Sequence, residues 1–436
     1  MKTQMLKTAA LALLLAGLFQ TVQAQIQYFR YYDQRGINVF ETPKQDDTVK
    51  YEGFKVRVGG GFTQGFQGLT NKNEAGSPAL YPRLAPGFNL AAANLNIDVQ
   101  LADGIALNLV TYLASRHHNE AWVKGGYIQF DKLPFKGKIW EDIMKVTTIK
   151  LGHMEINYGD AHFRRSDGGQ TLWNPFIENY IIDGFTTEIG GEIYVQKNGL
   201  MGMVGITNGL INGNVQRPLE PNSTTNTYKR NPSYYFKAAY DKRIDEKIRF
   251  RGAASLYTNS SSGRSTLFGG DRTGSNYVLV MEPASATAVA NFTSGRINPI
   301  ANANQITAYQ FNGFFKAYGF EFFGTYEGGN GRTRAEVVSN TPKRKFNQIA
   351  VDGLYRFGEK ENVYLGVRYN RAQGNFINAT TEQTVTRVAA GAGWFLTRNI
   401  LLKGEIVNQT YDGYPTGNLF RGGQFGGYVI QAVVGF

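Results

Sequence analysis

Gly426-Gly427-Tyr428-Val429-Ile430-Gln431-Ala432-Val433-Val434-Gly435-Phe436 is the most informative stretch of the sequence. Successive side chains of a β-strand point to opposite faces, so every second residue of this run lies on the same face. The residues of one such face are all apolar: Tyr428, Ile430, Ala432, Val434 and Phe436. The run therefore predicts a strand with one face turned toward an apolar phase.

The same pattern recurs through the chain from about residue 54, with turn residues between the runs. Sixteen strands are predicted in this way. They are 54–66, 88–101, 105–116, 122–131, 146–158, 185–196, 200–208, 233–243, 246–258, 305–317, 320–328, 346–357, 361–372, 384–396, 399–411 and 424–436.

The connections between these strands alternate in length. Short turns such as Ala102-Asp103-Gly104 and Tyr318-Gly319 separate long segments such as 159–184 and 259–304. Short periplasmic turns and long extracellular loops are typical of outer-membrane barrels, which have an even number of strands in bacteria. The sequence thus predicts an all-β fold in the outer membrane, a 16-stranded antiparallel transmembrane β-barrel over residues 54–436.

A soluble β-sandwich or propeller also uses alternating strands. The alternation of loop lengths, the aromatic final strand and an export signal oppose it. Residues 1–24 have the features of a signal peptide: Lys2 and Lys7, an apolar core over 9–19, and Val22-Gln23-Ala24 before the cleavage point. Residues 25–53 show little alternation and are interpreted as a periplasmic N-terminal segment, either a tail or a partial plug.

The net charge of +12 becomes +10 when Lys2 and Lys7 are removed with the signal peptide. The basic residues are dispersed and form no recognition-helix pattern, so nucleic acid is not an expected partner. An anionic solute and the phosphates of lipopolysaccharide fit the charge better. The chain has no cysteine, which excludes thiolate metal and redox sites, and no cofactor is expected.

Strand parity predicts which side chains face the lumen. It turns six basic residues inward, opposite apolar neighbours on the lipid side, and these are Arg57, Arg249, Arg251, Arg368, Arg387 and Lys403. Several acids have the same parity, among them Glu321, Asp352 and Glu405. A base at the lipid midplane costs about 2–4 kcal/mol, whereas one in water costs little, so we expect a wet interior of mixed charge. The simpler alternative is that these charges pair across the wall and stiffen it.

Segment 159–184 is the predicted pore constriction, with Arg164, Arg165, His162 and Asp160 as its polar residues. If the segment folds inward, its aromatic residues Trp173 and Phe176 would pack on the wall and the two arginines would face the aqueous path. The alternative is an outward loop whose arginines meet lipopolysaccharide or nearby acids. The Ser- and Gly-rich segment 259–304 is expected to be mobile and outside.

Catalytic signals are weak, and the chain is not expected to be an enzyme. There is no nucleophile elbow, P-loop or cysteine nucleophile. His117 and His118 lie near Glu120, but adjacent residues of a strand point to opposite faces and cannot share a metal ion.

A resemblance to a known family rests on the strand pattern and on two runs of sequence. They are Tyr31-Tyr32-Asp33-Gln34-Arg35-Gly36-Ile37-Asn38-Val39-Phe40-Glu41 and Lys150-Leu151-Gly152-His153-Met154-Glu155-Ile156-Asn157-Tyr158-Gly159. The chain resembles outer-membrane porins of the Bacteroidetes type, and more loosely the phosphate-selective porins O and P. The resemblance implies passive diffusion of solutes, commonly through a homotrimer. The phosphate-binding arginine ladder of that family cannot be matched residue by residue here.

The sequence therefore predicts an outer-membrane porin for small hydrophilic solutes, with a preference for anions that includes phosphate as a candidate. Its partners would be those anions, outer-membrane lipid and lipopolysaccharide. The alternative is a non-conducting structural or adhesion barrel with its function in segment 259–304.

Overall fold

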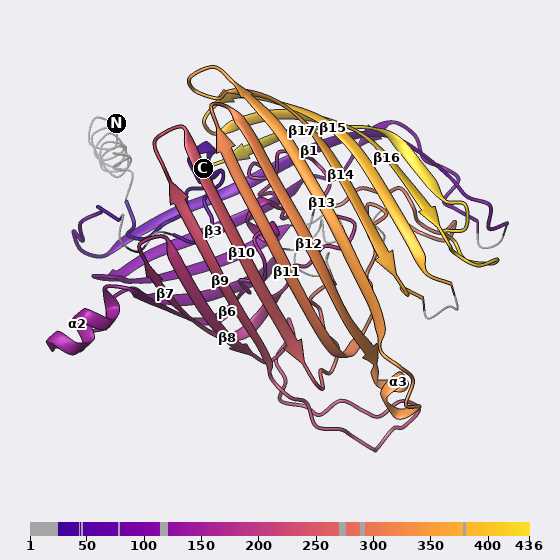
Figure 1. Ribbon diagram of the computed structural model, residues 1–436, viewed down its shortest axis with the longest axis horizontal. Coiled ribbons are helices and arrows are strands. Elements are labelled where there is room, and N and C mark those ends of the chain that lie inside the picture. The colour runs from indigo at the N-terminus through magenta and orange to yellow at the C-terminus, as the bar shows by residue number, and fades with distance from the viewer. Residues whose placement is uncertain are drawn as a thin grey trace, which may run out of the picture.

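The sixteen predicted strands form a closed antiparallel β-barrel (Figure 1). The computed structural model describes residues 25–42, 44, 47–76, 79–113, 121–269, 276–287, 293–377 and 381–436. The predicted signal peptide and the His117-His118 pair lie outside the described residues. Each strand pairs with its neighbour in sequence, and β1 pairs with β17 from Gly61↔Gly435 to Lys72↔Gln424 to close the ring. Closure pairs the backbone groups that a free sheet edge would expose to lipid.

The strands are bounded as follows: β1 Lys55–Lys72, β2 Gly87–Phe88, β3 Ala92–Ala102, β4 Ile105–Leu113, β5 Trp122–Phe130, β6 Thr147–Glu155, β7 Thr187–Lys197, β8 Leu200–Thr207, β9 Ser233–Arg243, β10 Ile248–Asn259, β11 Ala303–Ala317, β12 Phe320–Thr333, β13 Arg344–Phe357, β14 Val363–Gly374, β15 Gln383–Thr397, β16 Ile400–Asp412 and β17 Gln424–Gly435. The helices are η1 Gln34–Gly36, α2 Lys138–Met144, η3 Ala161–Arg164 and α3 Arg334–Val338.

The seventeen labelled segments amount to sixteen strands because β2 and β3 belong to one irregular strand beside β1. β3 pairs with β1 up to Thr63↔Ala92, and β2 resumes the pairing at Phe66↔Phe88 with the register shifted by one residue. The predicted strand 88–101 covers nearly all of both pieces. Segment 132–145, which is long for a turn, contains the short helix α2.

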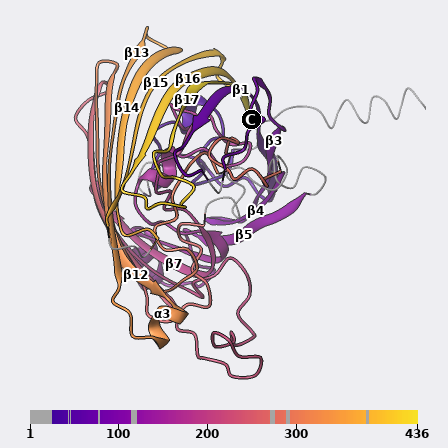
Figure 2. The ribbon, with the colours of Figure 1, turned by 90° about the vertical axis from the view of Figure 1, so that its right-hand side faces the viewer.

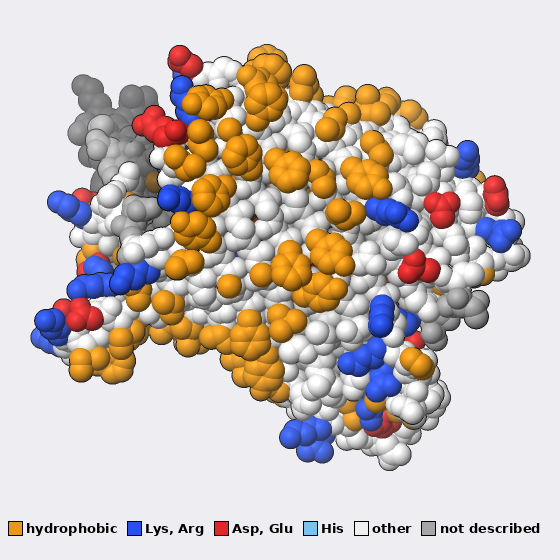
Figure 3. Space-filling view, in the orientation of Figure 1, with side chains coloured by type: hydrophobic (Ala, Val, Ile, Leu, Met, Phe, Trp, Pro, Cys, Tyr) orange, Lys and Arg blue, Asp and Glu red, His pale blue; other side chains and the backbone are white. Residues whose placement is uncertain are grey.

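Side chains alternate between the two faces of the wall as parity predicted. Val367 on β14 is 63% exposed, whereas its neighbour Arg368 is 3% exposed and points inward. Apolar side chains gather across the middle of the outer surface, and charged ones lie toward its ends (Figure 3). Among the described residues, no helix is long and apolar enough to cross a membrane.

The barrel interior is more densely packed than the sequence predicted. Inward-facing apolar side chains such as Tyr257 and Val433 form a buried cluster with Leu172 and Phe176 of segment 159–184. The expectation of a wet interior is therefore wrong for the part of the lumen that this cluster fills. Parity identified the inward face, but it carries no information about chain segments that fill the lumen, which appear as coils inside the ring of strands (Figure 2).

Segment 259–304 belongs to this packed interior, so the expectation that it is mobile and outside is wrong for its described parts. Leu267, Val280 and Ile297 are buried in the apolar cluster. The Ile297 amide donates to the carbonyl of Ile181 over 2.8 Å, which joins this segment to segment 159–184. The apolar run 277–281 supplies buried side chains of this segment. The polar average composition of segment 259–304 gave no sign of that run.

Residues 25–42 also lie among inward-facing side chains. The Asn38 amide donates to Glu321 of β12 over 2.7 Å, and Arg251 of β10 donates to Glu41 over 2.6 Å. On β1, a Cβ at Gly61 would lie 2.4 Å from Gln170 Oε1, so the glycine permits segment 159–184 to approach the wall closely. The lumen is thus occupied by three separate stretches of the chain.

The outward position of Val367, near the middle of β14, generates a stability prediction. The Val367→Arg variant should lose about 2–4 kcal/mol of unfolding free energy in phospholipid vesicles, because it places a charge at the lipid midplane. Val363→Arg, in the same strand beside the short turn, is the matched control and should lose about 0–1 kcal/mol. Denaturant unfolding measures both, and equal losses would contradict the assigned faces and depths.

Candidate functional site inside the barrel

Segment 159–184 leaves the end of β6, runs through the lumen and returns to β7. Inward-facing bases of β14 to β16 bind its backbone: Lys403 Nζ donates to three carbonyls at 2.7–3.0 Å, and Arg368 and Arg387 each donate to one at 2.6 Å. The accepting carbonyls are those of Thr171, Asn174, Phe176, Glu178 and Asn179. Three of the six bases predicted to line the lumen therefore hold this segment in place.

The backbone amides of the same segment also find partners on the wall. Glu405 accepts from the Ile177 amide over 2.7 Å. Further along, the Ile181 amide donates to Asn370 and the Ile182 amide to Gln348. A buried backbone group without a partner costs free energy comparable to a lost hydrogen bond. Inward polar residues of β13, β14 and β16 therefore supply the hydrogen bonds that allow an irregular segment to be buried.

Arg164 and Arg165 do not face an aqueous path, so that part of the constriction prediction is wrong. They are 3% and 5% exposed. Arg164 pairs with Glu321 of β12 over 2.7 Å, and Arg165 makes two hydrogen bonds of 2.7 Å to Asp183. Buried charges are retained when they are paired, and acids lie within reach of both guanidinium groups.

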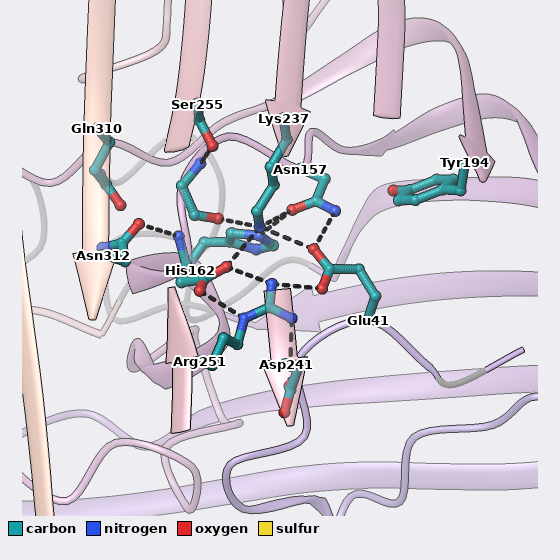
Figure 4. A network of polar contacts seen from close by, with 12 residues as sticks. Glu41, Asn157, His162, Tyr194, Lys237, Asp241, Arg251, Ser255, Gln310 and Asn312 are labelled. Atoms are coloured by element: carbon teal, nitrogen blue, oxygen red, sulfur yellow. Dashed lines mark hydrogen bonds and ion pairs between the residues drawn. The ribbon is translucent and has the colours of Figure 1, made fainter. Parts of the chain in front are cut away.

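Asp160 is a member of a buried ion network that joins three parts of the chain. Its partners Lys237 and Arg251 are labelled in Figure 4, together with Glu41. The Asp160 carboxylate lies 2.7 Å from Lys237 Nζ of β9 and 2.8 Å from Arg251 Nε of β10. Glu41 of the N-terminal stretch pairs with the same two bases at 2.9 and 2.6 Å. Arg251, a predicted lumen residue, therefore connects residues 25–42 to segment 159–184.

His162 lies beside this network and borders a cavity in the lumen. Its Nε2 is 3.0 Å from Asn157 Oδ1, and its Nδ1 contacts Glu155. Of the four predicted constriction residues, His162 lines the cavity, and the other three hold the segment that forms one of its walls.

The remaining predicted lumen residues also have acidic partners. Arg57 of β1 lies 3.5 Å from Asp98 of β3, and Arg249 makes hydrogen bonds of 2.8 and 2.6 Å to Asp241 across β9 and β10. Arg249 also donates to the carbonyl of Asn38 over 2.8 Å. The mixed charge of the interior is thus largely compensated by pairing.

Burial and pairing change the acidity of the carboxyl groups in segment 159–184. Burial opposes ionisation of Asp160, but Lys237 and Arg251 outweigh it and hold its pKa below the usual value. Asp183 behaves likewise, with Arg165 lowering its pKa. Glu178 differs, since burial raises its pKa to about 7 against the opposing charge of Arg387.

The main cavity has a volume of about 250 Å³ and lies on the opposite side of segment 159–184 from its docking strands. Its walls come from β3 to β7, from residues 28–42 and from segment 159–184. Five acids line it, and each contacts a basic side chain. The pairs are Glu41 with Lys237, Asp98 with Arg57, Asp131 with Lys44, Glu155 with His162 and Asp167 with Lys124.

Arg30 and Lys150 also line this cavity, and neither forms an ion pair with any residue that the structure describes. Glu192, opposite Lys150 in the β6–β7 ladder, instead accepts hydrogen bonds from Asn157, Tyr194 and Tyr235. Sequence reasoning missed both cations. Lys150 has the inward parity opposite Leu151 and could have been found, whereas Arg30 lies outside any strand and gave no periodic signal.

Metal chemistry finds no support in the described residues, where no group of three or more His, Asp or Glu side chains could hold an ion. His153 contacts Thr187 Oγ1 over 3.1 Å, and His162 contacts Glu155 and Asn157. The expected lack of enzyme activity stays a prediction.

The contacts of Lys403 generate a prediction about segment 159–184. Lys403→Met removes the donor to three buried carbonyls, and each one left unpaired costs about 1–3 kcal/mol. The segment should then loosen and be cleaved faster by trypsin after Arg164 or Arg165. Lys132→Met, at an exposed turn position paired with Asp103, is the matched control and should leave the cleavage rate unchanged. Equal rates in the native protein and Lys403→Met would contradict the anchoring role.

The raised pKa of Glu178 predicts a pH dependence of stability. The docked segment favours the protonated carboxyl, so the cost of ionising it is absent below about pH 4.3 and fully present above about pH 7. The melting temperature should therefore be lower at pH 8.5 than at pH 6. Glu178→Gln cannot ionise and should reduce this difference, and an unchanged difference in the variant would refute the assignment.

No protein-family model matches the chain, and no curated protein matches it in sequence. Among solved structures, the anion-selective porin from Comamonas acidovorans is similar, with a TM-score of 0.52 and 8% identity over 88% of this chain and 100% of that chain. The outer membrane channel DcaP of Acinetobacter baumannii has a TM-score of 0.51 and 11% identity over 89% and 99%. OmpT of Vibrio cholerae, in a structure described as the trimer form, has a TM-score of 0.50 and 9% identity over 88% and 100%. At these identities the likeness is one of fold, and the chain has the fold of outer-membrane porins.

Proposed function

We propose that the protein is an outer-membrane channel through which small hydrophilic solutes diffuse passively, with a preference for anions. The observation that carries the proposal is the cavity beside segment 159–184, which lies within a closed barrel and has a polar, charged lining. A hydrogen-bonding lining replaces part of the hydration shell of a solute, which makes entry into a narrow passage favourable.

The anion preference rests on Arg30 and Lys150. Four of the five acids of the cavity wall pair with a Lys or Arg side chain and Glu155 contacts His162, whereas these two cations form no ion pair with any described residue. Positive charge that is not directly paired with an acid, in a confined space, raises the local concentration of anions. Inorganic phosphate belongs to the anions that this chemistry accepts, and the proposal does not single it out.

The name of the porin from Comamonas acidovorans describes it as anion-selective, which agrees with this proposal. The trimer form of the Vibrio cholerae protein motivates a homotrimer as the assembly state. Contact with outer-membrane lipid and lipopolysaccharide follows from the position of such a barrel in the membrane.

A non-conducting structural or adhesion barrel is the second candidate. The observation that favours it is the filling of the lumen by residues 25–42, segment 159–184 and segment 259–304. Single-channel recording in planar bilayers separates the two candidates directly. Steps of current support the channel, and their absence in protein with a native strand content supports the closed barrel.

Ion selectivity tests the role of the two unpaired cations. In a KCl gradient, the native protein should show a reversal potential of anion-selective sign. Arg30→Gln and Lys150→Gln should each reduce the ratio of chloride to potassium permeability about two- to fivefold. A change of this size is expected because two unit charges 4 Å apart in water interact with an energy of ~1 kcal/mol.

Lys132→Gln removes one positive charge outside the cavity and should leave the ratio unchanged. A cation-selective native channel would refute the anion preference. Unchanged permeability ratios in both cavity variants would show that residues other than Arg30 and Lys150 determine the selectivity.

A further inference from the structure

We propose that the cavity lined by Arg30 and Lys150 is a binding site for small aromatic carboxylates, compounds with one planar ring and a carboxylate group. This inference rests on the proposed function, because such a ligand would reach the site along the same passage. It goes further by assigning the cavity a ligand class that its two free cations and its aromatic walls define together.

Arg30 presents a guanidinium group whose plane is already fixed. Its Nε donates to the carbonyl of Gly36 over 3.1 Å and its Nη2 to that of Phe163 over 2.8 Å. The guanidinium carbon lies 3.6 Å from the centre of the Trp173 ring, on which it stacks. Arginine has five N–H donors in a planar fork that matches a carboxylate, and the two carbonyls use two of them. The fixed group can therefore bind an anion with little further loss of conformational entropy.

Lys150 of β6 supplies a second positive charge to the cavity lining. Its ammonium lies 5.3 Å from the centre of the Tyr127 ring and 5.2 Å from that of Tyr194. Cation–π contacts of this length stabilise the charge but leave the donors of the ammonium without a carboxylate. A cation in a partly enclosed cavity without an acidic partner favours an anionic ligand over a neutral one.

Aromatic side chains make up much of the remaining wall. Six of them are half-buried and border the cavity: Tyr28, Phe29, Tyr32, Tyr127, Phe163 and Trp173. Aromatic rings pair favourably in stacked or edge-to-face geometry, so a ligand ring gains contacts here that a small aliphatic chain does not.

The size of the cavity suits a small ligand such as a single-ring compound. Pockets for drug-sized ligands measure roughly 300 to 1,000 Å³, and this cavity, at about 250 Å³, lies just below that range. Four of the five acids of the wall pair with Lys or Arg side chains, which reduces their repulsion of a carboxylate ligand. Charge, ring surface and volume thus point to the same class of compound.

The test is calorimetric titration of the full chain in detergent with three probes: benzoate, acetate and benzyl alcohol. Benzoate should bind at least tenfold more tightly than either of the others, since acetate lacks the ring and benzyl alcohol lacks the charge. Equal affinity for acetate and benzoate would overturn the aromatic part of the proposal. Equal affinity for benzyl alcohol and benzoate would overturn the anionic part.

Variants place the binding in this cavity. Arg30→Gln and Lys150→Gln should each weaken benzoate binding at least fivefold, whereas Lys150→Arg keeps the charge and should retain most of the affinity. Lys132→Gln, the surface control, should bind as the native protein does. Unchanged benzoate affinity in both cavity variants would overturn the site. If a variant fails to fold, the three-probe comparison on the native chain still decides the ligand class.

Conductance separates this inference from the proposed function. Benzoate binding in a protein that carries no current would refute the channel and leave the binding site standing. Current without selective benzoate binding would refute the inference and leave the channel standing.

Discussion

The need to satisfy backbone hydrogen bonds inside the barrel determines how its interior is built. An irregular segment can enter the lumen only if the wall offers partners for its amides and carbonyls. Here Lys403, Arg368, Arg387 and Glu405 supply these partners for segment 159–184. The charged residues of the inner face thus act first as anchors, and the space available to a solute is what the anchored segment leaves free.

This arrangement divides the barrel into two unequal sides. On one side, three stretches of chain pack against the wall and form an apolar cluster with paired charges around it, and the wall residues of this cluster lie between β7 and β17 and on β1. On the side of β3 to β7, a cavity with a polar and aromatic lining remains. An ion network of Glu41, Asp160, Lys237 and Arg251 marks the boundary between the two sides. Loss of its charges would affect the position of the N-terminal stretch as well as that of the loop.

The fold could be predicted from the sequence because a strand in a membrane barrel has a simple periodicity. The inward orientation of Arg251, Arg368 and Lys403 followed from the same rule, and all three are buried on the inner face. This alternation predicts only the direction in which a side chain points. Whether an inward arginine meets water or a carbonyl depends on contacts across more than a hundred residues, such as the 190 that separate Arg368 from Glu178. For this reason parity predicted the lumen residues but not the segment they hold, and it could not find Arg30, which lies in no strand.

The contacts of the N-terminal stretch have a consequence for the order of assembly. Asn38 is among the first residues of the described chain, yet its partner Glu321 lies 283 residues further on. Glu41 likewise pairs with Arg251, which lies 210 residues away in the sequence. Contacts of such sequence separation carry a large entropic cost before they form, so they form late. The first part of the described chain is therefore expected to settle into the lumen only after β10 and β12, which carry these partners, have been placed in the wall.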